Sequence, residues 1–313
     1  MSSTSNQIPK SEKSPPQQSD IVIDPDGKIH ISFLWEDLRD LPRSLNEKYV
    51  SAKPAFILRN WNPTEFKSPD SLLSEYEHCK LCPKECGFNR VKNKHPTCGD
   101  FELRVATFGI SFGDEPEIRG TGGSGAIMLS GCPLKCPSCH NPEKVADGTA
   151  INAQDFFSLC KKLYEDGAHN IQILSPTVHM PILRVLLRSL KSDSFPIPIV
   201  LKSSGYESVD QLRSLEGLVD IYLPDFKFGQ CSQWSQRAGV KNYFEVAVAA
   251  LHEMARQVGA LEVDDQGVAT KGVLVRHVQA PLPSAEKTQI RNFLNQLPEG
   301  IRVSYQDNFV SLE

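Results

Sequence analysis

Short β-rich runs alternate with amphipathic helical periods from about residue 125 onward, and this alternation restricts the possible folds more than any other feature of the chain. The β-rich runs are 126–130, 171–174, 197–201, 219–223, 272–278 and 301–304. The helical periods are 152–166, 180–190, 208–215, 243–258 and 284–297. Strands that alternate with helices run parallel and are joined by crossover helices. The pattern therefore predicts an α/β fold.

The number of strand–helix units leaves two architectures open. Six units are fewer than the eight of a full TIM barrel, so the chain forms either a partial (β/α)6 barrel or an open, doubly wound sheet. Asn152 is suited to begin the first helix and Gly167 to end it. The polar segment 259–271 is expected to be a loop or a hairpin.

Composition excludes several classes of protein. The chain has 313 residues, with 34 Lys and Arg against 38 Asp and Glu, and a net charge of −4. This charge excludes a strongly basic nucleic-acid-binding protein and gives no reason to expect an anionic membrane as partner. No run approaches 18 apolar residues, and residues 1–20 contain no apolar segment of signal-peptide length. We therefore expect a cytoplasmic protein whose nine cysteines are thiolates or metal ligands rather than disulfides.

The chain divides into four parts by composition. Residues 1–20 are rich in Ser, Pro, Gln and Lys and are expected to be a disordered tail. Residues 21–75 carry scattered aromatic residues between prolines and are expected to form an irregular lead-in. Residues 76–100 hold four cysteines, and residues 101–313 hold the predicted α/β domain.

Three cysteines follow the first predicted strand in the run Cys132-Pro-Leu-Lys-Cys136-Pro-Ser-Cys139. Thiolates with this C-x3-C-x2-C spacing, on a loop that leaves a strand end, hold three irons of a cubane cluster and leave the fourth iron open. An open iron is a catalytic position, as an open coordination position on zinc is. The alternatives are a zinc knuckle that lacks its fourth ligand, and a chance spacing.

The longer run Gly131-Cys132-x3-Cys136-x2-Cys139-His140-Asn141-Pro142 resembles the cluster loop of radical S-adenosylmethionine enzymes. Its last part is similar to the activating enzymes of glycyl radical enzymes, such as pyruvate formate-lyase activating enzyme. The resemblance covers most of residues 76–306 and is strongest to activating enzymes with a cysteine-rich segment ahead of the barrel. It implies a partial (β/α)6 barrel of the radical S-adenosylmethionine type with a small cysteine-rich N-terminal segment.

The resemblance also implies an activity and its partners. A 4Fe–4S cluster held by Cys132, Cys136 and Cys139 reductively cleaves S-adenosylmethionine to methionine and a 5′-deoxyadenosyl radical. Ferredoxin or flavodoxin supplies the low-potential electron, and a glycyl radical enzyme is a candidate protein substrate. Two alternatives stay open. The same radical modifies another peptide or a small molecule, or the chain is a non-catalytic zinc-binding interaction module.

Residues at the predicted strand ends are implied by the resemblance to bind S-adenosylmethionine. After the second strand, Ser175 or Thr177 contacts the methionine amine in place of the family's Gly-Gly-Glu type segment. Ser203, after the third strand, reaches the ribose, although Lys202 replaces the family's Asp. Asp225-Phe-Lys227 matches an Asp-x-Lys sequence after the fourth strand.

The carboxylate of S-adenosylmethionine has two candidate partners in this interpretation, Lys227 and Arg276. Arg276 is the second candidate, provided that it points into the barrel. The loop departs from the family at Ser138, where an aromatic residue usually precedes the third cysteine. The chain also ends at Glu313, soon after the last predicted strand, without the family's polar motif beyond it.

A second cysteine group precedes the predicted domain, in the spacing Cys79-x2-Cys82-x3-Cys86-x11-Cys98. Four thiolates within 20 residues indicate a bound metal, either tetrahedral zinc or a second iron–sulfur cluster, with free thiols as the remaining alternative. The basic residues of this segment are expected mostly on a solvated face; they are Lys80, Lys84, Arg90, Lys92 and Lys94.

Two other features are assigned no chemistry. The glycines of 120–125 satisfy the dinucleotide-binding spacing G-x-G-x-x-G, but they precede a strand instead of following one. We therefore expect a flexible turn there. The scattered histidines His169, His179, His252 and His277 have no second histidine at ligand spacing and are expected to be packed or surface residues.

Overall fold

The computed structural model describes residues 21–23, 29–31, 36–37, 70–137, 139, 141, 148–278 and 282–306. The chain divides into two compact units, Met1–Leu34 and Trp35–Glu313. The described part of the first unit is an antiparallel pair of strands, β1 (Ile21–Ile23) and β2 (Ile29–Ile31). The predicted tail 1–20 and most of the predicted lead-in lie outside the described residues.

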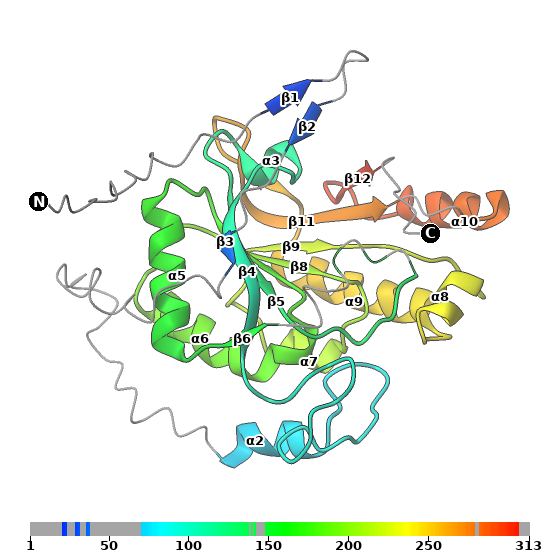
Figure 1. Cartoon of the computed structure of the whole chain (residues 1–313). Coiled ribbons are helices and arrows are strands. Elements are labelled where there is room, and N and C mark those ends of the chain that lie inside the picture. The colour runs from blue at the N-terminus through cyan, green and yellow to red at the C-terminus, as the bar shows by residue number, and fades with distance from the viewer. Residues whose placement is uncertain are drawn as a thin grey trace, which may run out of the picture. The chain divides into compact units, whose positions relative to one another are not determined.

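The second unit is built on a sheet in which six parallel strands lie side by side in chain order (Figure 1). These strands are β5 (Ser124–Leu129), β7 (Ile171–Leu174), β8 (Ile199–Ser203), β9 (Ile221–Pro224), β11 (Ala269–Val278) and β12 (Arg302–Gln306). A doubly wound sheet reverses its strand order at a switch point, and this sheet does not. Among the described residues the sheet is not closed.

Antiparallel strands complete the sheet at both ends. β4 (Arg104–Ser111) pairs with β5, and the short strands β3 (Glu36–Asp37) and β6 (Thr149–Ala150) pair with β4. At the other end, β10 (Glu262–Val263) forms a hairpin with the start of β11. The expected α/β class is confirmed as a mixed fold around a mostly parallel sheet, and the polar segment 259–271 contains the hairpin.

Helices follow the parallel strands, and the sequence predicts all of them except the short helix Gln233–Arg237. They are α5 (Ala153–Glu165), α6 (Met180–Ser192), α7 (Val209–Arg213), α8 (Gln233–Arg237), α9 (Tyr243–Val258) and α10 (Ser284–Leu294). Asn152 begins α5 with a capping box, in which its side chain accepts from the Asp155 amide and the Asp155 carboxylate accepts from the Asn152 amide. Before β5 lie α2 (Asp70–Glu77) and the short α3 (Pro116–Arg119).

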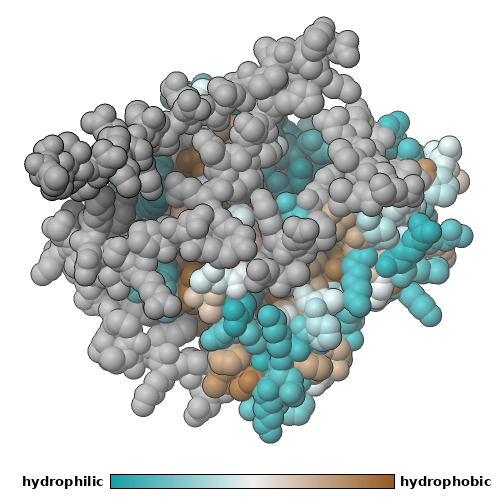
Figure 2. Space-filling view, viewed as in Figure 1, coloured by the Kyte–Doolittle hydropathy of each residue, from teal (hydrophilic) through white to brown (hydrophobic). Residues whose placement is uncertain are grey.

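The two faces of the sheet have different surroundings. Alternate strand residues such as Ile127, Ile173 and Val275 join the main core, to which α5, α6, α9 and α10 contribute apolar side chains. The other set forms a small second cluster around Ile118 of α3, with Val200, Ile221, Leu223, Leu261, Ala269 and Leu274. On the surface of this unit, hydrophilic residues gather at the lower edge of Figure 2, where Figure 1 draws α2 and the segment after it.

Some element boundaries differ from the prediction by a few residues. β8 begins at Ile199 instead of 197, because Pro198 has no amide hydrogen to donate to a ladder. β9 begins after Asp220, whose carboxylate accepts from the Ile199 amide at 2.7 Å and from Lys191. Gly120 ends α3 and residues 120–122 form a turn before β5, as predicted, whereas Gly125 already belongs to β5.

None of the helices in the described part of the chain is both long enough and apolar enough to cross a membrane.

Candidate functional site

The predicted cluster loop leaves the carboxyl end of β5. Gly131 turns the chain with φ +88°, and a Cβ atom there would lie 2.7 Å from the Cys98 carbonyl oxygen. The Cys132 amide donates to the Thr97 carbonyl at 3.0 Å, and the Cys139 amide to the Cys136 carbonyl at 3.1 Å. Residues Ser138, His140 and 142–147 of this loop lie outside the described residues.

The three thiols of the cluster loop influence one another electrostatically. The pKa of Cys132 is raised to about 12, chiefly by burial and also by the neighbouring Cys136 and Cys139. Burial also raises the pKa of Cys136. The Lys227 ammonium acts in the opposite direction and lowers the pKa values of both Cys132 and Cys136. The loop thiols and the cation after β9 therefore lie within electrostatic reach of each other.

The residues of this loop suit an iron–sulfur cluster by their chemistry rather than by a preformed arrangement. In the described part of the chain, no group of three or more His, Cys, Asp or Glu side chains is close enough to hold a metal ion. The donor set nevertheless fits in its chemistry, since three thiols share one strand-end loop and the Lys227 ammonium favours the ionised form of Cys132 and Cys136. Raised thiol pKa values mean that a metal must displace protons when it binds.

Asp225 is the centre of a charged group at the ends of β9 and β11. Its carboxylate pairs with Lys227 and, at 3.0 Å, with Arg276, whose Nε donates to Glu115 at 2.7 Å. Burial opposes ionisation of Asp225, but the two cations lower its pKa to about 2. Arg276 thus points toward Asp225 and Glu115. Both residues that are predicted to bind the carboxylate of S-adenosylmethionine, Lys227 and Arg276, are paired here with carboxylates of the protein itself.

Lys202 has a carboxylate partner of its own at the end of β8. Its Nζ lies 2.5 Å from the buried Asp114, which also accepts from Ser111 at 2.7 Å and from Gln172 at 3.2 Å. Burial raises the pKa of Asp114, but Lys202 and these hydrogen bonds lower it below its usual value. Lys202 therefore belongs to a buried ion pair at this strand end.

Glu207 joins the hydroxyl groups of two strand ends and was not predicted. Its buried carboxylate accepts from Thr177 at 2.8 Å, from Ser203 at 2.8 Å and from Ser204 at 3.3 Å. Burial raises its pKa, whereas the three hydroxyl donors lower it. Two predicted contacts of S-adenosylmethionine, Thr177 and Ser203, are thus brought together. The third, Ser175, has the left-handed φ of +57° that favours glycine.

The four-cysteine segment packs directly against the cluster loop. Lys84 Nζ lies 2.5 Å from the Pro133 carbonyl oxygen, and Cys98 Sγ lies 3.7 Å from the Cys132 carbonyl oxygen. The thiols of this segment also interact, since the pKa of Cys82 is raised to about 11, chiefly by burial and also by Cys98, Cys79 and Cys86. The two predicted cysteine groups are therefore neighbours in the structure.

Arg90 is the exception to the expected solvated basic face, because its side chain is fully buried, whereas the four lysines of the segment are exposed. It donates to the carbonyl groups of Val178 at 2.8 Å, Cys98 at 3.0 Å, Gly99 at 3.3 Å and Asp100, and stacks over Tyr76 at 5.1 Å. A guanidinium offers enough donors for such a carbonyl cage. Arg90 thus fastens the four-cysteine segment to the turn after β7.

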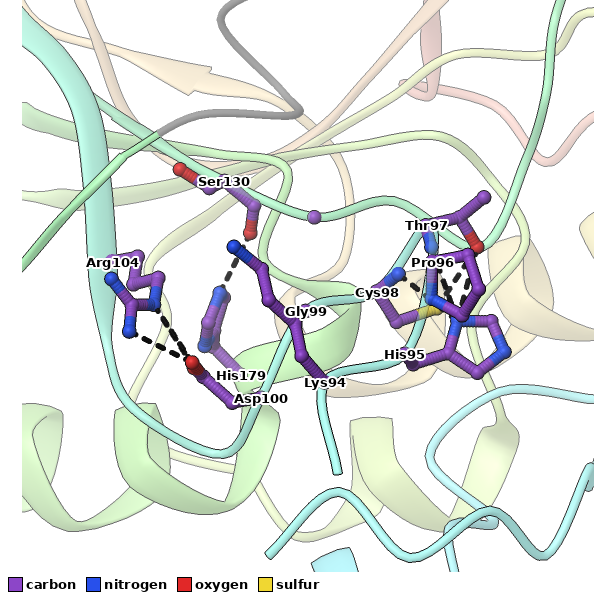
Figure 3. A pocket seen from close by; sticks show the side chains of 11 residues that line it. Lys94, His95, Pro96, Thr97, Cys98, Gly99, Asp100, Arg104, Ser130 and His179 are labelled. Atoms are coloured by element: carbon purple, nitrogen blue, oxygen red, sulfur yellow. Dashed lines mark hydrogen bonds and ion pairs between the residues drawn. The ribbon is translucent and has the colours of Figure 1, made fainter. Parts of the chain in front are cut away.

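A small pocket of about 30 Å³ lies between this segment, the end of β5 and the 3₁₀ turn η2 (Thr177–His179) (Figure 3). The buried His179 faces the pocket and donates from Nε2 to the Ser130 carbonyl at 2.8 Å. Its Nδ1 and the Ser130 hydroxyl have no partner among the described atoms. The pocket is large enough for a water molecule, which would satisfy both groups.

His179 is expected to make the fold sensitive to acid. Burial lowers its pKa to about 4, so the unfolded chain takes up the proton first as pH falls below 6.5. We expect the free energy of unfolding to fall by about 2 kcal/mol between pH 6.5 and pH 5 on this account. Denaturation of the parent and of His179→Gln, whose amide retains the donor, measures it. An equal loss in both proteins would contradict the assignment.

Comparisons with known proteins give partial similarities. No family model matches the chain. An uncharacterized protein of Methanocaldococcus jannaschii is 29% identical over 236 residues, which cover 70% of this chain and 65% of the relative. A Haemophilus influenzae protein named "Putative glycyl-radical enzyme activating enzyme" is 31% identical over 118 residues, 35% of this chain and 43% of that protein. The chain thus spans less than two-thirds of the length of each of these curated relatives.

Proposed function

We propose that the chain is a radical S-adenosylmethionine enzyme whose 4Fe–4S cluster is held by Cys132, Cys136 and Cys139. The observation that carries the proposal is the C-x3-C-x2-C loop at the carboxyl end of the first parallel strand, within electrostatic reach of Lys227. Active sites of parallel α/β folds lie at this edge of the sheet. The partial similarity to the Haemophilus influenzae protein supports the same class.

The chain's own residues have separate roles in this proposal. When bound, the cluster supplies the electron that cleaves S-adenosylmethionine to methionine and a 5′-deoxyadenosyl radical. Lys227 and Arg276 hold the carboxylate of S-adenosylmethionine, and Asp225 orients both cations. Ser175, Thr177 and Ser203 contact the amine and ribose. Glu207 fixes the hydroxyl groups of Thr177 and Ser203 for this purpose.

The finer assignments belong to the same proposal. Residues 101–313 form a partial (β/α)6 barrel of the radical S-adenosylmethionine type, supported by the chain order of its six parallel strands. The substrate is a glycyl radical enzyme, which the enzyme activates after reduction by ferredoxin or flavodoxin; the name of the Haemophilus influenzae relative supports this choice.

Anaerobic reconstitution tests the proposal directly. The full chain is loaded with iron and sulfide, reduced with dithionite and mixed with S-adenosylmethionine. We expect a brown protein that absorbs broadly near 400 nm and releases 5′-deoxyadenosine. A colourless protein that retains zinc and releases no 5′-deoxyadenosine would contradict the proposal and favour a zinc-binding module.

Lys227→Ala and Arg276→Ala are expected to weaken S-adenosylmethionine binding by roughly thirty- to a hundredfold with normal cluster content. The loss of one charge-assisted hydrogen bond in a largely dry site costs on the order of 2–3 kcal/mol. Titration of the reduced proteins with S-adenosylmethionine, followed by electron paramagnetic resonance, measures the change. The exposed Lys271→Ala is the control. If both variants bind as tightly as the control, the two residues have no role in binding.

The upstream thiols Cys79, Cys82, Cys86 and Cys98 are proposed to hold zinc or a second iron–sulfur cluster. Their number and spacing support this, since four thiols within 20 residues of sequence make up the full ligand set of a structural zinc site.

Cys82→Ala is expected to release one metal equivalent, because three thiolates hold a structural ion far less tightly than four. The reduced-cluster signal of the downstream loop should be largely retained. Metal analysis of the variant beside the parent provides the measurement. Unchanged zinc and iron contents would mean that the upstream group binds no metal.

A further inference from the structure

Basic residues are concentrated in three segments that lie apart in the sequence. Residues 78–99, 130–137 and 231–242 together carry eight Lys and Arg residues and a single acidic residue, Glu85. The whole chain has a net charge of −4. The rest of the protein therefore carries a net negative charge, whereas the three segments together carry a net positive charge.

The fold brings these segments together around the cluster loop. Lys84 donates to the Pro133 carbonyl at 2.5 Å, and a Cβ atom on Gly239 would lie 3.5 Å from the same ammonium. The Lys135 amide donates to the Ala238 carbonyl at 2.9 Å. Burial lowers the pKa of His95 most, followed by Arg90, and both Lys84 and Lys135 lower it as well. We call the surface formed by Lys84, Lys135, Arg237 and Lys241 the basic face.

The basic face differs from the cations at the ends of the parallel strands in how its charges are balanced. Lys202, Lys227 and Arg276 each pair with a carboxylate. The four cations of the basic face are all exposed, and none of them forms an ion pair with an acidic side chain of the described residues. Arg237 lies over the Trp234 ring at 5.6 Å, so an aromatic surface accompanies the charge. Unpaired exposed cations beside an aromatic ring are typical of an interface for an acidic partner.

We propose that the basic face is the docking surface for an acidic one-electron carrier protein, of the flavodoxin or ferredoxin class. The inference rests on the proposed function, which requires an electron at the cluster loop. The reduced carrier loses one electron and the cluster held by Cys132, Cys136 and Cys139 gains it, with no bond formed or broken. Lys135 stands between two of these cysteines in sequence, so a partner on the basic face lies against the loop that receives the electron.

The charge of the remaining surface favours a small acidic protein over an extended polyanion. Nucleic acid or an anionic membrane would reach past the four cations to the acidic remainder of the molecule and be repelled there. A compact carrier contacts the basic face alone. Complementary charge of this kind speeds the encounter and makes it sensitive to salt.

The test reverses two charges that lie outside both cysteine groups. Arg237→Glu/Lys241→Glu is compared with the matched control Arg188→Glu/Lys271→Glu, which changes exposed cations on α6 and β11 by the same amount. The reconstituted holoenzymes are titrated with an acidic bacterial flavodoxin at about 50 mM and 250 mM salt. We expect the first variant to bind roughly ten- to a hundredfold more weakly at low salt, with a smaller salt dependence, and the control to bind like the parent.

Dithionite separates this inference from the proposed function. It reduces the cluster without a carrier, so S-adenosylmethionine cleavage should be unchanged in both variants. Equal flavodoxin binding by variant, control and parent would overturn the docking surface, whatever the cleavage result. Absence of cleavage with dithionite in the parent would overturn the proposed function instead. If a single-stranded oligonucleotide or phosphatidylserine vesicles bind as tightly as flavodoxin, with the same loss in the variant, the assignment to an acidic protein is wrong.

Discussion

Replacement of Cys132, Cys136 or Cys139 by alanine is expected to abolish both 4Fe–4S assembly and release of 5′-deoxyadenosine. Three thiolates are the minimum set that holds three irons of a cubane while the fourth iron stays open, so no ligand is dispensable. Iron and sulfide content, absorbance near 400 nm and 5′-deoxyadenosine after dithionite reduction measure the effect.

Cys231→Ala is the matched control for these variants. Cys231 is an exposed free thiol outside both cysteine groups, and its removal should leave cluster content and cleavage at the level of the parent. One ligand variant that retained full cleavage would show that the three-thiolate assignment is wrong. A loss of cleavage in Cys231→Ala would indicate instead that cysteine replacement harms the protein in general.

Arg90→Met is expected to lower the free energy of unfolding by about 3–5 kcal/mol. Methionine fills much of the space of the arginine stem but donates nothing, so the carbonyl groups of Val178, Cys98, Gly99 and Asp100 lose a shared donor inside the protein. Such a loss is a large part of the roughly 5–15 kcal/mol that stabilises a typical domain.

Chemical denaturation of the parent, Arg90→Met and Lys92→Met measures this effect. Lys92 is an exposed cation two residues away, and its replacement should change the free energy of unfolding by at most about 0.5 kcal/mol. If Arg90→Met were as stable as Lys92→Met, the carbonyl groups around Arg90 would have found other partners, and Arg90 would not fasten the two segments.

Local sequence patterns predicted the secondary structure well, because the information lies within each element. The helix Tyr243–Val258 agrees with the prediction at both ends, and Asn152 caps α5 as expected. The start of β8 was misplaced because an apolar run that contains Pro198 was read as strand throughout. Apolar alternation marks which side chains are buried, but it does not mark where ladder hydrogen bonds begin.

The polar contacts of the site were predicted less completely, since they join residues far apart in the sequence. The resemblance, together with strand-end position, indicated Asp225, Lys227 and Arg276, and the fold brings these three together. Glu207 and Asp114 belong to no recognisable sequence motif. Asp114 and its partner Lys202 are 88 positions apart in the chain, so the sequence does not reveal their pairing. The sequence could not single out Arg90 as the buried member of its basic segment, because a buried guanidinium and a solvated one look alike in sequence.

The chain order of the parallel strands has a consequence for synthesis of the protein. Each parallel strand after β5 pairs with the parallel strand made before it, so the parallel part of the sheet can grow at one edge as the chain leaves the ribosome. The four-cysteine segment, the cluster loop and the turn that receives Arg90 are all complete by residue 179. Arg276 arrives about a hundred residues later, in β11. A nascent chain therefore contains the four-cysteine segment and the cluster loop before Arg276, the second cation paired with Asp225, has been synthesised.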